Sequence, residues 1–172
     1  MSTIARFDQW ADDQLEKLRG NPIADTLFAN ASHLGDFSVI WHIIGVARGL
    51  TSAQRARQAI VLSAVLGAES LVVNQGVKRL FRRTRPTQAG DARFTVRQPS
   101  TSSFPSGHAS SAAFAATLLS DDHPCLRPMF WLIAAIVSLS RPYVRAHHAS
   151  DIAGGLVTGS VLARLARRVW PR

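Results

Sequence analysis

A short stretch in the last third of the chain combines residue types that can do chemistry: two arginines, two adjacent histidines and an aspartate. It occupies residues 140–151, between two apolar runs, where buried charge is costly unless it has partners or a task. If a helix begins near Ala146, His147 and Asp151 lie four residues apart on one of its faces. A carboxylate there can accept the proton of one ring nitrogen and leave a lone pair on the other. The spacing therefore predicts an oriented, neutral imidazole, which is a nucleophile or a base.

Two further groups of residues stand at the ends of predicted helices. Lys78 and Arg85 are seven residues apart, close to two helical turns, so both cations can point the same way. Ser106, Gly107 and His108 stand where a helix begins, and the free N–H groups and dipole of a helix start bind phosphate oxygens. Both patterns have plainer interpretations. The basic cluster around Lys78 can meet lipid headgroups or nucleic acid, and Ser106 can be an N-cap beside an incidental histidine.

The composition favours a protein that binds phosphate or an anionic membrane surface. The chain has 172 residues, which is one domain by default, with 47% hydrophobic residues, 18% charged residues and a mean hydropathy of +0.06. Its net charge of +9 comes almost wholly from arginine, which is suited to phosphate recognition. The single cysteine, Cys125, excludes an intrachain disulfide and a cysteine-based metal site. The polar, charged N-terminus predicts no cleavable signal peptide.

The hydrophobic pattern predicts an all-α protein, because no strand alternation of any length is present. We expect a membrane helical bundle of about five core helices plus an N-terminal amphipathic helix, with a soluble bundle as the alternative. Small residues at 155 and 159, and at 111 and 115, predict close helix contacts. Core helices are expected over the following ranges: 37–50, 59–77, about 106–119, 129–139 and 152–165.

The whole chain, 1–172, is interpreted as a single domain with two parts. Residues 1–34 form an amphipathic N-terminal segment, whose helix breaks at Gly20-Asn21-Pro22 and is followed by a polar segment ending near Asp36. This helix either packs on its own domain or binds the membrane surface. Residues 35–172 form the bundle, and an up-down arrangement would bring all three groups of candidate residues to the same side.

Together the three groups resemble a known family. They match, without a substitution, the three-part signature of the type-2 phosphatidic acid phosphatase superfamily, which includes lipid phosphate phosphatases, bacterial acid phosphatases and vanadium haloperoxidases. The matching residues run from 78 to 151 and are Lys78-x6-Arg85-Pro86, Pro105-Ser106-Gly107-His108 and Ser140-Arg141-x5-His147-x3-Asp151.

The resemblance implies a role for each matched residue. His147 would attack phosphorus and form a phosphohistidine, while Asp151 orients and stabilises its imidazole. His108 would protonate the leaving alkoxide and then activate water. Fixed cations and donors would hold the phosphoryl oxygens, and the family needs no metal for phosphatase activity, so neither a metal nor a cofactor is expected. The expected phosphate-binding residues are Lys78, Arg85, Ser106, Gly107 and Arg141.

The implied protein is a multi-pass phosphatase of the cell membrane, with no nucleic-acid partner. Its substrate would be a phosphomonoester or diphosphate of a membrane lipid: phosphatidic acid, phosphatidylglycerophosphate, or a polyprenyl phosphate or diphosphate, including prenyl-linked sugar phosphates. The motifs do not distinguish among these, and they say nothing about oligomeric state. The family's bacterial membrane members usually place the site on the extracytoplasmic side. Counting basic residues does not decide the orientation, because they divide almost equally between the two sides once Lys78, Arg85 and Arg141 are set aside as catalytic.

Several alternatives stay open at this point. The chain could be related to the soluble acid phosphatases or haloperoxidases, or could be a non-catalytic basic binder of membranes or nucleic acid. His147 and Asp151 could be a metal pair with His108 as a third ligand, although the nearby cations oppose a metal. His148 is a weaker candidate than its neighbour for the nucleophile. Glu69 is either a functional residue or a structural partner inside the bundle.

Three arginines beside Lys78 and Arg85 are expected to have the plainer role of meeting lipid headgroups or nucleic acid. They are Arg79, Arg82 and Arg83.

Overall fold

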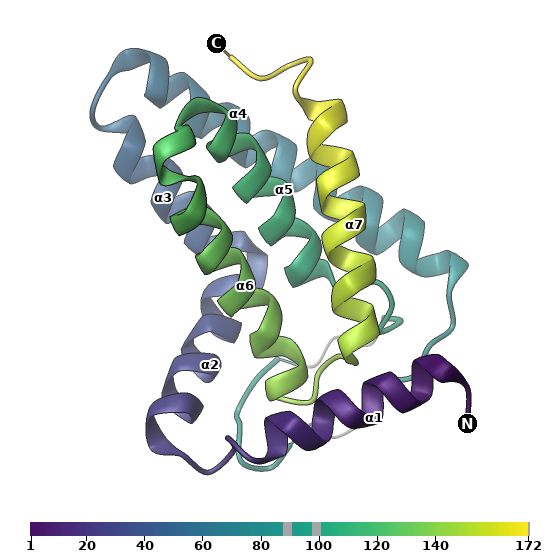
Figure 1. Ribbon diagram of the computed structural model, residues 1–172. Helices are drawn as coiled ribbons and strands as arrows, with labels where there is room; N and C mark the ends of the chain where they lie inside the picture. Colours follow the sequence, from purple (N-terminus) through teal and green to yellow (C-terminus); the bar gives the residue numbers. More distant parts are fainter. Residues whose placement is uncertain (88–90, 98–100, 172) are drawn as a thin grey trace.

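A computed structural model describes residues 1–87, 91–97 and 101–171 of the chain (Figure 1). Within those ranges the protein contains helices and no strand, so the predicted all-α class is confirmed. Short helical turns at 36–38, 72–76, 77–80 and 124–126 join the main elements. The α-helices are α1 (Thr3–Glu16), α2 (Pro22–Gly35), α3 (Val39–Gly49), α4 (Ala53–Leu71), α5 (Gly107–Asp122), α6 (Arg127–Tyr143) and α7 (Ala149–Ala166).

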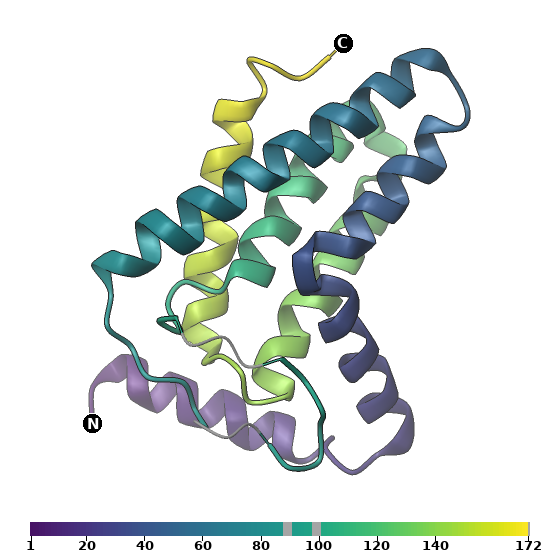
Figure 2. The ribbon, with the colours of Figure 1, turned by 180° about the vertical axis from the view of Figure 1, so that it is seen from behind.

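Helix α5 is the centre of the bundle, with α4, α6 and α7 around it (Figures 1 and 2). Its sequence is rich in alanine and serine, and nearly every residue from Ala109 to Ser120 is buried. Small side chains let the neighbouring backbones approach: a Cβ added at Gly155 would lie 2.5 Å from the carbonyl oxygen of Ser106, and one at Gly159 would overlap the carbonyl of Ser110. The predicted close contact at these glycines is therefore present, between α7 and α5.

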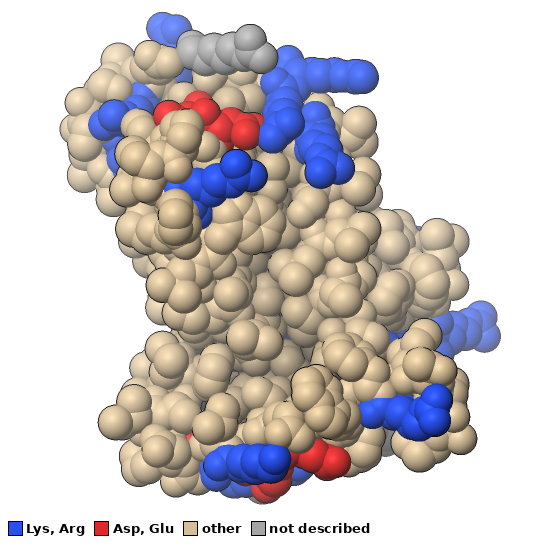
Figure 3. Space-filling model, viewed as in Figure 1, with Lys and Arg blue, Asp and Glu red and all other residues tan. Residues whose placement is uncertain are grey.

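The face of the bundle seen in Figure 3 carries little charge over its middle, and large apolar side chains are exposed on the outer helices. In Figure 3, Lys and Arg gather toward the two ends of the molecule, with a band of uncharged surface between them. A soluble monomer rarely exposes a continuous apolar band, so this distribution favours a hydrocarbon environment. The large apolar side chains that are more than half exposed on α3, α4, α6 and α7 include Ile43, Ile60, Leu132, Val157 and Leu165.

One continuous helical segment is long and apolar enough to cross a membrane by itself. Helix α4 continues through the turns at 72–76 and 77–80, and together they cover Ala53–Leu80. In the described residues no other helix meets the same test of length and composition. The segment ends at Leu80. It therefore places Lys78, the first residue of the Lys78–Arg85 group, at one end of the bundle.

The N-terminal segment differs from the prediction. The polar segment expected before Asp36 is instead helix α2. Asn21 caps its start by accepting hydrogen bonds from the N–H groups of Ile23 (3.0 Å) and Ala24 (3.2 Å), and Pro22 occupies the first turn. The Asn-Pro pair therefore ends one helix and begins the next, because proline fits the first turn of a helix as well as it breaks an existing one.

Helix α1 packs across the ends of α6 and α7 (Figure 1). Buried Arg19, just after α1, donates hydrogen bonds to the carbonyl oxygens of Tyr143 (2.8 Å) and Pro142 (2.9 Å) at the end of α6. Of the two alternatives considered for the N-terminal helix, the structure shows packing on its own domain. Its outer face still exposes Ile4 and Trp10.

Candidate active site

The three groups of candidate residues meet at one cavity. It has a volume of about 320 Å³ and lies at the end of the bundle that α1 covers. The turn after α4, the first turn of α5, the last turn of α6 and the loop before α7 each contribute to its wall. The candidate residues that line it are Lys78, Gly107, His108, Arg141 and His147.

The cavity contains buried positive charge. Lys78 is 5% exposed and Arg141 is fully buried, and no described carboxylate lies within ion-pair distance of either. One terminal nitrogen of Arg141 donates to the hydroxyl of Ser32, but Nε and Nη2 are buried with no acceptor among the described residues. Unpaired buried cations are costly. The arrangement is therefore suited to an anion, which would supply the missing acceptors.

Gly107 brings the start of α5 beside the lysine. A Cβ added at Gly107 would lie 3.8 Å from Lys78 Nζ and 3.4 Å from Asn74 Oδ1. Ser106 is the N-cap of α5: its hydroxyl accepts from the N–H of Ala109 (3.4 Å) and its own N–H donates to the carbonyl of Asp151 (3.0 Å). Ser106 therefore has the N-cap role that was considered for it, and its contact with phosphate stays a prediction.

Arg85 lies against His147. Its Nη1 donates to the carbonyl oxygen of Ala146 (2.7 Å) and is 3.2 Å from Nε2 of His147, while Nη2 donates to the carbonyl of Thr101 (3.2 Å). A guanidinium group can only donate, so Nε2 of His147 is the acceptor in this contact and carries the lone pair. The ring proton is then on Nδ1.

His147 is almost fully buried, and its Nδ1 faces Asp151. The distance from Nδ1 to Oδ2 of Asp151 is 3.6 Å, which is an ion-pair distance and longer than a hydrogen bond. Burial, and the charges of Arg85 and the other cavity cations, outweigh this carboxylate and lower the pKa of His147 to about 3. The imidazole is therefore neutral at physiological pH, with its lone pair on the nitrogen beside Arg85.

The helix start near Ala146 that was considered for the His147–Asp151 pair is wrong, although the pair forms. Helix α7 begins at Ala149 with His148 as its N-cap, so His147 precedes the helix. Asp151 accepts the backbone N–H of His148 at 2.8 Å and thereby caps the first turn. This turn, rather than a shared helical face, brings Asp151 toward His147.

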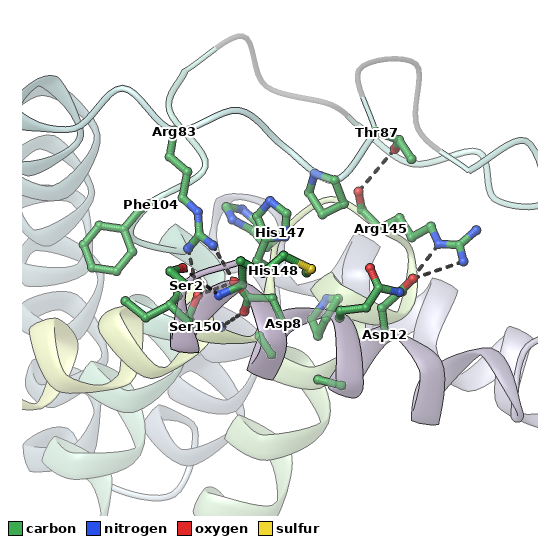
Figure 4. A pocket seen from close by; sticks show the side chains of 18 of the residues that line it. Ser2, Asp8, Asp12, Arg83, Thr87, Phe104, Arg145, His147, His148 and Ser150 are labelled. Atoms are coloured by element: carbon green, nitrogen blue, oxygen red, sulfur yellow. Dashed lines mark hydrogen bonds and ion pairs between the residues drawn. The ribbon is translucent and has the colours of Figure 1, made fainter.

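Arg83 and Asp8 complete the surroundings of Asp151, and sequence reasoning missed both. Arg83 donates to Oδ1 of Asp151 (2.6 Å) and to Asp8 in α1 (2.5 Å), and Asp8 also accepts the N–H of Ser150 (2.8 Å). These contacts lie in a second cavity, of about 920 Å³, between α1 and the loops that contain Arg83 and His147, and His147 lines both cavities (Figure 4). The expectation that Arg83 meets lipid headgroups is corrected by these ion pairs. No local pattern relates it to Asp8, which is far away in the chain.

His108 is held from a different direction. Its Nε2 lies 3.1 Å from the carbonyl oxygen of Ser32 and 3.3 Å from Oδ1 of Asp36, both contributed by the segment at the end of α2. Gly35 lies directly against its ring, where an added Cβ would overlap Cδ2. Sequence reasoning did not identify Asp36, because it falls in the segment interpreted as polar connection.

The two remaining candidates have structural partners. Glu69 is 4% exposed, accepts a hydrogen bond from the hydroxyl of Ser110 and also borders the cavity. His148 caps α7, and its Nε2 lies 3.3 Å from the carbonyl oxygen of Thr84. Neither ring nitrogen of His148 is placed beside the cations of the first cavity, which agrees with the expectation that it is a weaker candidate than His147 for the nucleophile.

Comparison with known proteins gives consistent matches. Residues 58–172 match the family model described as the PAP2 superfamily. The decaprenylphosphoryl-5-phosphoribose phosphatase of Mycobacterium tuberculosis (strain CDC 1551 / Oshkosh) is 31% identical over 135 residues, which are 78% of this chain and 73% of that protein.

Two solved structures resemble the fold over nearly the whole chain. The transmembrane PAP2 type phosphatidylglycerolphosphate phosphatase from Bacillus subtilis is 28% identical with a TM-score of 0.66, and the match covers 94% of this chain and 85% of that one. Aquifex aeolicus LpxE is 19% identical with a TM-score of 0.73, covering 98% and 96%, and this likeness concerns the fold alone.

Proposed function

The chain belongs to the PAP2 superfamily, and on that premise we propose that it is an integral membrane phosphatase that hydrolyses a lipid phosphate through a phosphohistidine at His147. The observation that carries the proposal is the first cavity. It combines two imidazoles with the unpaired buried donors of Arg141 and the buried ammonium group of Lys78. A phosphoryl group supplies the acceptors that these donors lack, whereas an uncharged apolar ligand offers none.

The proposed first step is attack by His147. Its Nε2 lone pair forms a bond to phosphorus while the bond from phosphorus to the leaving oxygen breaks, and His108 gives a proton to that oxygen. The proton on Nδ1 of His147 faces Asp151, which stabilises the positive charge that the ring gains. The products of this step are a lipid alcohol, or a lipid monophosphate from a diphosphate, and phosphohistidine.

The proposed second step is hydrolysis of the intermediate. His108, now without its extra proton, removes a proton from water as the water oxygen attacks phosphorus, and the bond from phosphorus to Nε2 breaks. Inorganic phosphate leaves and His147 regains its lone pair. Lys78, Arg85 and Arg141, with the amide at the start of α5, hold the phosphoryl oxygens in both steps as their charge redistributes. On this proposal the fixed cations do the work of a metal ion.

We propose that the substrate is a phosphomonoester or diphosphate of a membrane lipid. The mycobacterial relative is named for a decaprenylphosphoryl phosphoribose and the Bacillus one for a phosphatidylglycerol phosphate, so both names join a phosphate to a lipid. The apolar outer band of the bundle supports a multi-pass position in the cell membrane, in which the lipid chain stays in the bilayer while its phosphate enters the cavity. The extracytoplasmic orientation of the site rests on the family resemblance.

Phosphate release from a panel of lipid phosphates in detergent micelles tests the proposal. The unsubstituted protein should release phosphate in the presence of a chelator, and His147→Gln should reduce release by at least about 10⁴-fold, because no nucleophile remains. The matched control is His33→Gln, since His33 is exposed on the surface of α2 and should leave the rate unchanged. Normal turnover by His147→Gln would refute the mechanism. Binding of anionic lipid with no phosphate release by the unsubstituted protein would favour a non-catalytic binder.

A further inference from the structure

We propose that Asp36 is the positioning carboxylate of His108, so that the acid–base histidine has its own carboxylate partner, separate from that of His147. The inference rests on the proposed function, because it concerns the same reaction. Asp36 lies outside the residues that match the family model, which begin at 58. Its role is therefore inferred from the geometry of this chain alone.

The hydrogen-bond geometry fixes the tautomer of His108. Both groups that face Nε2, the carbonyl of Ser32 at 3.1 Å and the carboxylate of Asp36 at 3.3 Å, are acceptors. Nε2 must therefore carry a proton, and Nδ1 is the nitrogen that exchanges protons with substrate and water. When Nδ1 is also protonated, the ring is a cation, and Asp36 is the only described carboxylate within ion-pair distance of it.

The charge of Asp36 matters because burial and the charge of Arg141 both disfavour a protonated ring. Buried Arg141 lines the same cavity and disfavours a protonated His108. Burial alone would raise the pKa of Asp36, but its interaction with His108 and the charge of Arg141 lower it overall, so this carboxylate is ionised at neutral pH. Asp36 therefore offsets the repulsion between Arg141 and the acid form of the histidine.

The backbone around Asp36 is strained in a way that holds it over the cavity. Phe37 (φ 51°) and Ser38 (φ 60°) both have left-handed backbone conformations, although neither is glycine. Residues with this conformation are strained and persist where the surrounding structure requires them. The guanidinium of Arg97 lies 4.7 Å from the ring centroid of Phe37 and covers the turn. Gly35, on the other side, has no side chain and so lets the turn approach His108.

The test compares two leaving groups in the first turnover. The alkoxide of a lipid phosphate needs a proton from His108, whereas the phenolate of 4-nitrophenyl phosphate leaves without one. We expect Asp36→Asn to slow the first turnover of the lipid phosphate by about 10- to 100-fold and that of 4-nitrophenyl phosphate by less than about 3-fold. The control is Asp121→Asn, which removes an exposed carboxylate paired with Arg167 at the other end of α5 and should slow neither.

A double substitution separates positioning from folding. If Asp36 acts through His108, Asp36→Asn should have no further effect on lipid phosphate hydrolysis in a His108→Gln background, because the two changes remove the same function. Melting temperatures in detergent check that the Asp36→Asn and His108→Gln proteins, and the protein with both changes, are folded. Equal losses with both leaving groups, or an undiminished effect in the His108→Gln background, would overturn the inference. If the unsubstituted protein hydrolysed neither substrate, the proposed function would fail first, and this inference with it.

Discussion

The two histidines of the cavity are held in opposite ways. His147 lies in a loop, presents Nδ1 to Asp151 and directs Nε2 toward Arg85. His108 lies in the first turn of a helix, presents Nε2 to Asp36 and the end of α2, and leaves Nδ1 for the substrate side. The two imidazoles are thus fixed in different tautomers within one cavity. The ring nitrogen with the lone pair is Nε2 in His147 and Nδ1 in His108.

This difference suits two different tasks. A nucleophile needs a permanent lone pair, and His147 has one because burial and adjacent cations disfavour its protonation. An acid–base catalyst must gain and lose a proton in each cycle. Burial and Arg141 disfavour the protonated ring of His108 as well, and Asp36, 3.3 Å from Nε2, acts against them by stabilising the protonated form. If both histidines had the same surroundings, either could act as the nucleophile or as the acid–base group. Their different surroundings suit each of them to one of these two roles.

Among tests of the contrast between the two histidines, the largest effect should come from separating the two steps of the reaction. His108→Gln removes the base that activates water, so steady-state turnover should fall by about 10²- to 10⁴-fold. With 4-nitrophenyl phosphate, whose leaving group needs no acid, attack by His147 still proceeds and phosphorylated protein should accumulate. Mass spectrometry under alkaline conditions, where phosphohistidine survives, should locate the phosphate on residue 147.

The matched comparison is His147→Gln, which should carry no phosphate with the same substrate. A phosphorylated His108, or phosphoprotein in the His147→Gln variant, would reverse the assignment of the two roles. Failure of His108→Gln to accumulate any phosphoprotein, while it still turns over, would show that water is activated by another group.

A smaller effect is expected from the residues that hold Asp151. Arg83→Gln removes the donor that joins Asp151 to Asp8, so Oδ1 of Asp151 loses this partner and the carboxylate is held less firmly beside His147, through the N–H of His148 on Oδ2. Since a hydrogen bond to a charged group contributes on the order of 1.5–3 kcal/mol, kcat should fall by about 10- to 100-fold with little change in KM. Asp8→Asn leaves the contact between Arg83 and Asp151 in place, and we expect a loss of less than about 10-fold.

The control for this pair is Asp13→Asn, because Asp13 is exposed on the same helix and does not contact the site. Hydrolysis is measured with one lipid phosphate over a range of concentrations. A loss confined to KM, or equal losses for the Asp8 and Asp13 variants, would mean that α1 covers the site without orienting its aspartate.

The comparison also explains which parts of the site could be predicted from the sequence. The partner of His147 is four residues away, so local spacing identified Asp151 even though the helix begins later than expected. The partners of His108 come from the end of α2, which is distant in sequence and was interpreted as a polar connection. A carboxylate that reaches its histidine only through tertiary packing leaves no periodic signal.

The same reasoning applies to the fold. Apolar runs with small residues predicted the bundle and the contact between α5 and α7, because helix packing depends on side-chain size at fixed intervals. The roles of α1 and α2 were less accessible, since they depend on single polar contacts such as those of Arg19, Asp8 and Asp36. Five basic residues between 78 and 85 look alike in sequence, and tertiary contacts such as the ion pairs of Arg83 to Asp151 and Asp8 are what distinguish them.

The smallest expected change is an absence of titration at His147. A histidine in a model peptide takes up its proton near pH 6.5, whereas the folded-state pKa of His147 is lowered to about 3. As pH falls from 7 to about 4, the NMR shifts of its imidazole, assigned by comparison with His147→Gln, should stay those of a neutral ring. The unfolded chain gains a proton in this window and the folded one does not, so stability should decrease as pH falls. A ring that titrates near pH 6.5 would mean that water and counter-ions screen the cavity cations. The proposed contrast between a permanently neutral nucleophile and a proton-exchanging partner would then be lost.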